Sequence, residues 1–94
     1  MPDLSKKDAG VIMALIERFE RQRLPTLLAL KKKTDSGAAL SDVDLEFLDK
    51  VNDDAMRTMP LTEGHPELHS FCARVIHLYR EITAQALENE TQRR

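Results

Sequence analysis

The sequence has little cysteine, few aromatic residues and no long hydrophobic run, and each shortage excludes a class of fold. With one cysteine, the chain can form no internal disulfide. Three phenylalanines, one tyrosine and no tryptophan leave a core of Leu, Ile, Val, Ala and Met, which suits packed helices better than packed β-sheets. The longest purely apolar run, "VIMALI", is far shorter than the roughly 20 residues that span a bilayer.

The length predicts one domain. The 94 residues can bury one modest core, and we expect a single helical domain over 1–94. The opening "MPDLSKKDAG" has no basic stretch followed by an apolar one, so it does not resemble a secretory signal. We therefore expect a soluble, cytoplasmic protein with no membrane partner and no cofactor.

Charge is unevenly distributed along the chain. Residues 1–33 carry eight basic and four acidic side chains, whereas residues 34–67 carry two basic and nine acidic ones. The two segments either attract each other, within the fold or across a symmetric dimer, or form separate solvated faces of opposite sign.

The first periodic segment covers residues 5–33. Ser5 begins a capping-box pattern, and Ile12, Leu15, Ile16 and Phe19 follow at helical spacing. Pro25 interrupts the pattern, because proline lacks a backbone donor and disfavours helical geometry in the residue before it. The helix either kinks there or ends near residue 23 and restarts with Pro25 in its first turn.

Two further helices are predicted. "SDVD" at residues 41–44 is a capping box that starts a helix with a wide apolar sector, ended by Pro60. Pro66 starts the third helix, which carries a long apolar stripe to about residue 89, and residues 88–94 are expected to fray. The fold predicted is all-α: an antiparallel up-down bundle of three long helices, or four if the first breaks at Pro25.

"EGHPELHSFC" gathers the candidate metal or ligand residues His65, His69 and Cys72. A structural zinc site needs four ligands, and a catalytic one needs three with water, but only three are present and His65 precedes the helix. Cys72 falls within the apolar stripe, where a free cysteine usually packs as a small hydrophobe. We therefore expect no metal here, with His65 capping the helix and His69 at the edge of its buried face.

Basic residues of the first segment are the candidate anion-binding groups: Arg18, Arg21 and Lys32. Nucleic-acid binding through them is one alternative function, although the chain is slightly acidic and lacks interleaved aromatic residues for base stacking.

A helical enzyme or small-molecule-binding protein is another alternative. The order of a long, a shorter and a long helix resembles the layout of the all-helical chorismate mutases, and this resemblance covers helix order only. It implies an intertwined dimer that binds a dicarboxylate through arginine and lysine side chains. The characteristic residues of that family do not align with this chain, so no catalytic residue is predicted.

The function that the sequence favours is a small non-enzymatic protein–protein interaction module that binds a protein partner or itself as a homodimer. Apolar residues off the main stripes exceed what a three-helix monomer of this size covers, and a two-fold dimer would bury the excess. The expected interface combines the segment after Pro25 with the outer side of the second helix. Its residues are Leu27, Leu28, Leu45, Met56, Met59 and Leu61.

Overall fold

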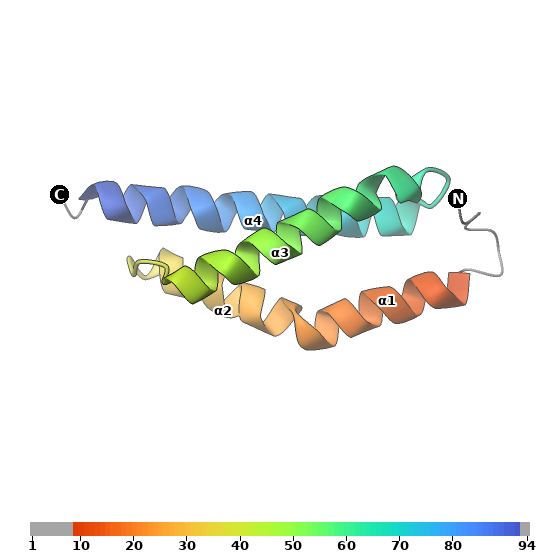
Figure 1. Cartoon of the computed structure of the whole chain (residues 1–94), viewed down its shortest axis with the longest axis horizontal. Coiled ribbons are helices and arrows are strands. Elements are labelled where there is room, and N and C mark those ends of the chain that lie inside the picture. Colours follow the sequence, from red (N-terminus) through yellow and green to blue (C-terminus); the bar gives the residue numbers. More distant parts are fainter. Residues whose placement is uncertain (1–8, 93–94) are drawn as a thin grey trace.

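The computed structural model describes residues 9–92, which contain only helices and the turns that join them (Figure 1). The elements are α1 (Ala9–Gln22), α2 (Leu24–Asp35), α3 (Asp42–Thr58), the short 3-10 helix η2 (Met59–Thr62) and α4 (Pro66–Gln92). The chain traverses the long dimension of the 53 × 22 × 18 Å molecule three times, with α1 and α2 forming one bent rod (Figure 1). The all-helical fold with packed helices is confirmed. Within the described range, no helix is both long and apolar enough to cross a membrane.

Pro25 places the bend between α1 and α2. α1 ends at Gln22 and α2 begins at Leu24, with Pro25 in its first turn. Backbone hydrogen bonds still run across the junction, from Arg23 N to Phe19 O at 2.8 Å and from Leu27 N to Arg23 O at 3.0 Å. The junction is therefore a proline kink that redirects the rod without opening a loop. The predicted helix start at Ser5 lies outside the described residues.

The end of α2 is fixed by a glycine and by α4. Gly37 has a φ of +95°, and the backbone bonds from Gly37 N to Thr34 O and from Ala38 N to Lys33 O form a Schellman cap. The Asn89 amide donates to Thr34 O at 2.7 Å and to Ala38 O at 3.1 Å. The tail expected to fray from residue 88 is thus helical to Gln92 in the structure, and its Asn89 is buried.

The capping box predicted at the start of α3 is present. Asp44 N donates to Ser41 Oγ at 3.1 Å, and Ser41 N donates to Asp44 Oδ2 at 3.0 Å. Lys33 of α2 reaches the same carboxylate at 2.7 Å, so one acid caps α3 and ties it to α2. Val43 in the first turn of α3 is 74% exposed, so the buried face of this helix begins further along the chain.

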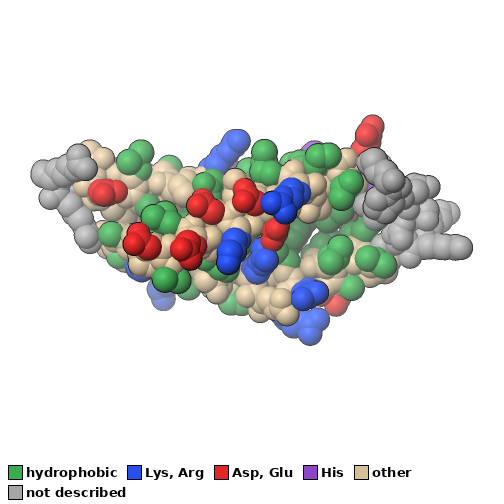
Figure 2. All heavy atoms as spheres, viewed as in Figure 1, with side chains coloured by type: hydrophobic (Ala, Val, Ile, Leu, Met, Phe, Trp, Pro, Cys, Tyr) green, Lys and Arg blue, Asp and Glu red, His purple; other side chains and the backbone are tan. Residues whose placement is uncertain are grey.

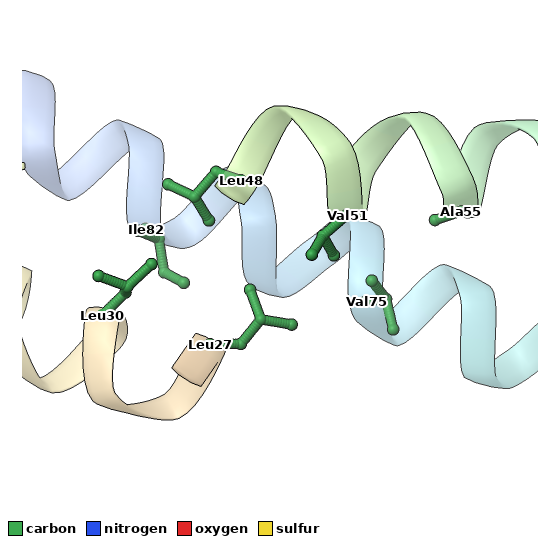
Figure 3. Close-up of a cluster of buried hydrophobic side chains, with 7 residues drawn as sticks. All are labelled: Leu27, Leu30, Leu48, Val51, Ala55, Val75 and Ile82. Atoms are coloured by element: carbon green, nitrogen blue, oxygen red, sulfur yellow. The ribbon is translucent and has the colours of Figure 1, made fainter. Parts of the chain in front are cut away.

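The main core lies where α2, α3 and α4 meet (Figure 3). α3 and α2 both pack closely on α4, which is the central element of the bundle. The seven buried side chains of this core, labelled in Figure 3, are Leu27, Leu30, Leu48, Val51, Ala55, Val75 and Ile82. A second, smaller cluster of Ile12, Leu68 and Cys72 joins α1 to the start of α4. α1 therefore lies largely outside the main core.

Candidate functional site

α1 carries more apolar surface than the fold covers. Among residues 10–22 of α1, Ile12 is the one buried apolar side chain, and Ile16 and Phe19 are half-buried. Val11 and Leu15 are 54% and 53% exposed, although Leu15 belongs to the stripe expected to face the core. The helix packs on α4 and continues into α2, but it makes little contact with α3. The physical reason is the kink at Pro25, which directs α1 away from α3 (Figure 1).

The space left between α1 and α3, with α4 as its floor, forms the candidate site, which we call the α1–α3 groove. Figure 2 shows the surface hollowed between these two helices, beside exposed hydrophobic side chains of both. The hollow has a volume of about 150 Å³. An apolar cavity of this size holds a benzene-sized group, equivalent to one bulky apolar side chain. Its lining residues are Leu15, Ile16, Phe19, Asp54, Ala55, Thr58, Leu68, Phe71, Cys72 and Val75.

Helix packing fixes the floor and one wall of the groove. The rings of Phe19 on α1 and Phe71 on α4 meet edge to face, with centroids 5.2 Å apart and planes at 90°. This is a favoured aromatic geometry, and it anchors α1 to α4 beside the kink. On the other side of α1 a second hollow of about 220 Å³ lies against α4, lined in part by Glu20, Leu24 and Leu78. α1 therefore contacts α4 along a narrow strip between the two hollows.

The two polar side chains of the groove already have partners. Asp54 forms an ion pair with Arg23 at the kink, and Thr58 Oγ1 donates to Asp54 O at 2.7 Å. The only cysteine, Cys72, lies in the floor, and burial raises the pKa of its thiol. A raised pKa lowers the thiolate fraction at neutral pH and so disfavours nucleophilic chemistry. The arrangement suits the binding of apolar side chains better than acid–base or covalent catalysis.

The histidine–cysteine cluster of the sequence separates in space. His69 Nδ1 lies 3.1 Å from Thr62 Oγ1, and Thr62 in turn donates to Met59 O at 2.6 Å. His65 contributes its backbone, since its carbonyl accepts from His69 N at 3.0 Å. Among residues 9–92, no three His, Cys, Asp or Glu side chains are grouped as a metal ion requires. The side-chain contact of His69 is therefore with Thr62 of η2.

The residues expected to form one interface are divided by the fold. Leu27 is fully buried in the main core and offers no surface, so its assignment to the interface is corrected. Met59 is half-buried against the smaller cluster around Ile12. Both residues were placed on the surface because the spacing of apolar residues does not show which of several apolar faces contacts the neighbouring helix. Exposed apolar surface remains at Leu28, Leu45, Met56 and Leu61.

Leu28 and Leu45 lie on opposite sides of α4. Leu28 is one turn before Lys31, whose ammonium lies 3.6 Å from Glu81 of α4. Leu45 instead borders a hollow of about 490 Å³ with Thr83, Ala86, Leu87 and Glu90 of α4. Successive residues of a helix are rotated by about 100° about its axis, so these four residues of α4 lie at least 120° round the helix from Glu81. The two leucines therefore cannot belong to one continuous patch.

The basic candidates do not converge on a pocket. Arg18 and Arg21 are exposed on α1, and Lys32 is exposed on α2 beyond the kink. Other basic residues of the same segment are paired with α3 instead: Arg23 with Asp54, and Lys33 with Asp44. The basic first segment and the acidic α3 thus attract each other within the fold, one of the arrangements expected from the charge distribution.

The groove itself is the feature that the sequence interpretation missed. The available signal is "VIMALI", residues 11–16, in which six consecutive apolar residues must place some side chains off any single helical face.

Comparisons with known proteins give no further guide to the site. No protein-family model matches the chain, no curated protein matches its sequence, and no solved structure matches its fold.

Proposed function

We propose that this protein is an interaction module and that the α1–α3 groove binds the apolar face of a helix from another protein. The observation that carries the proposal is the exposure of Leu15 and Val11 on α1 beside the apolar hollow of about 150 Å³ between α1 and α3. Exposed apolar surface concentrated at a concave site is typical of protein-binding surfaces.

A helix is the occupant that suits this geometry. The floor extends over Leu68 to Val75 of α4, which is about two helical turns or roughly 12 Å. Rods α1–α2, α3 and α4 occupy three positions of a bundle, which we take to be antiparallel and up-down. A fourth helix beside α1 and α3 would complete it with ordinary packing between ridges and grooves. One bulky apolar side chain of that helix would fill the hollow, and its apolar neighbours at spacings of three and four residues would pack beside it.

Titration with an uncharged amphipathic peptide tests the proposal. The peptide carries Leu and Ala on one face and Gln on the other, and binding is followed by calorimetry. We expect saturable binding that Leu15→Asp weakens at least about tenfold, because a carboxylate then lies against the apolar floor. Ala14→Asp is the matched control, since Ala14 is exposed on α1 and lines none of the hollows. Absence of binding to the native chain, or equal loss in both variants, contradicts the proposal.

Self-association is a second proposed activity, at a different surface that we call the α3–α4 seam. Leu45 and Leu87 are 45% and 67% exposed on the hollow of about 490 Å³ between α3 and the second half of α4. Met56 extends this apolar edge along α3, three turns from Leu45. A two-fold pairing of two seams would cover all three side chains, and the mass of the protein in solution tests it.

A further inference from the structure

We propose that the α1–α3 groove selects a helix whose apolar face is flanked by acidic side chains. This inference rests on the proposed binding function and adds the chemistry of the partner. The supporting observation is that the charged residues beside the groove are basic, whereas most of the other charged residues of α3 are acidic.

The edge of the groove on α1 carries an arginine. Arg18 lies one turn after the lining residue Leu15 and is exposed. Its guanidinium makes a weak contact of 3.4 Å with Gln22 Oε1, one turn further along the same edge. Within residues 9–92, Arg18 takes part in no ion pair.

The edge on α3 is basic as well. Lys50 lies one turn before the lining residue Asp54, and Arg57 lies nearly one turn after it. Both are exposed, and neither forms an ion pair with any residue in the described part of the chain. Asp54 does not offset them, because its carboxylate is taken by Arg23.

The acidic residues of α3 point elsewhere. At about 100° per residue, Glu46, Asp49 and Asp53 follow the helix round beyond Lys50 and Arg57, away from the groove. On α1, Glu20 lines the hollow on the opposite side of the helix. Figure 2 shows Lys and Arg side chains next to the hollow with acidic atoms between them, and further acidic side chains away from it. The charged residues nearest the groove lining on α1 and α3 are thus basic, and Glu46 and Asp53 lie one turn before Lys50 and Arg57, about 40° further from the groove.

Charged groups at the rim of an apolar site select partners by sign and steer association, whereas the buried apolar contacts supply most of the affinity. An acidic amphipathic helix would place carboxylates opposite Arg18 on one edge and opposite Lys50 and Arg57 on the other. A basic helix with the same apolar face would meet like charges on both edges.

Three peptides with one apolar face and different flanks test this selection by calorimetry: Gln, Glu or Lys on the polar face. At low salt we expect the Glu peptide to bind about tenfold more tightly than the Gln peptide, and the Lys peptide more weakly than both. The difference should shrink in 0.5 M salt, because exposed charges are screened. Arg18→Gln with Arg57→Gln should remove most of the preference. The control pair, Lys32→Gln with Arg80→Gln, lowers the net charge equally at exposed positions outside the groove lining and should leave the preference in place.

The remaining outcomes distinguish failure of the acidic-partner inference from failure of the proposed binding function. Equal or tighter binding of the Lys peptide, or equal effects of the two variant pairs, overturns the acidic-partner inference and leaves the groove as a binding site. Failure of all three peptides to bind overturns the proposed function as well. A concentration-dependent mass that Leu15→Asp abolishes would make a second copy of the chain the occupant and would also overturn the inference.

Discussion

Asn89 anchors the C-terminal turns of α4, a segment whose sequence has no apolar stripe to hold it against the other helices. It is 4% exposed, and its amide joins the last turn of α4 to two carbonyl groups at the end of α2. Gln85 donates to its carbonyl oxygen at 2.9 Å, so both ends of the amide are bonded. The α2–α3 turn is therefore held by the far end of the chain.

Replacing Asn89 should destabilise the fold. We expect Asn89→Ala to lower the free energy of unfolding by about 2 kcal/mol, because the buried carbonyl of Thr34 and the half-buried carbonyl of Ala38 each lose a hydrogen bond. Urea denaturation followed by circular dichroism measures the change. Glu88→Ala, at an exposed neighbouring position, is the control and should alter stability by less than about 0.5 kcal/mol. Similar values for the two variants would show that the Asn89 bonds contribute little.

Asp44 should make stability depend on pH. The hydrogen bond from Lys33, followed by those from Ser41, holds the pKa of Asp44 below its ordinary value of 3.8. A carboxyl group with a lowered pKa stabilises the fold above pH 3.8, and this contribution is lost as the pH falls through the lowered value. We expect Asp44→Asn to cost about 1 kcal/mol or less at pH 7, and the deficit relative to the native chain to shrink below pH 3.8. Asp42→Asn is the control; a deficit for Asp44→Asn that is constant from pH 7 to pH 2 would refute the role of the charge.

At the scale of elements, the sequence predicts helices better than it predicts their partners. The capping box at Ser41 and Asp44, the proline starts at Pro25 and Pro66 and the stop at Gly37 depend on local chemistry, and the structure contains each of them. The groove depends on the direction of the kink at Pro25. That direction is set by packing between distant helices, which spacing along one helix does not encode.

The same limit explains why Leu27 was assigned to a surface although it is buried. Leu27 and Leu28 are adjacent in sequence, yet one is fully buried and the other half exposed. A wide apolar sector shows that a helix has more than one apolar neighbour, but it does not show which side is covered. Burial of Asn89 was unpredictable for a different reason: a polar residue is buried where acceptors are available, and those acceptors are 51 and 55 residues away.

α1 should open more readily than the other helices. It contributes only Ile12, with half-buried Ile16 and Phe19, to contacts with α4, and hollows lie on both of its sides. Elements with few buried apolar contacts open at low free energy. Cys72 lies beneath α1 and is the single thiol of the chain, so its rate of reaction with a disulfide reagent reports the opening.

Weakening the contact between α1 and α4 should therefore expose Cys72. We expect Ile12→Ala to raise its labelling rate about thirtyfold, corresponding to about 2 kcal/mol of lost contact between α1 and α4. Met13→Ala is the matched control, because Met13 is the exposed neighbour of Ile12. If Ile12→Ala and Met13→Ala label at the same rate, α1 is not the element that covers Cys72.

Over residues 9–92 the molecule is elongated, and its apolar hollows include the α1–α3 groove and, towards the other end, the α3–α4 seam. Sedimentation equilibrium over a range of concentrations tests whether the seam joins two copies. We expect a mass that rises above 10.7 kDa with concentration, and Leu45→Asp to return it to that value. Glu46→Asp, a neighbouring exposed position, should have no effect. A constant 10.7 kDa for the native chain would contradict self-association.

Chemical-shift mapping locates a bound peptide on the surface and so shows whether the α1–α3 groove is a binding site. The backbone amide spectrum of the labelled protein is recorded during titration with the Glu-flanked amphipathic peptide. We expect saturable changes concentrated at residues of the groove wall and floor, among them Leu15, Phe19, Ala55, Phe71 and Cys72. Changes confined to Leu45, Leu87 and their neighbours, or no changes at saturating peptide, would contradict it.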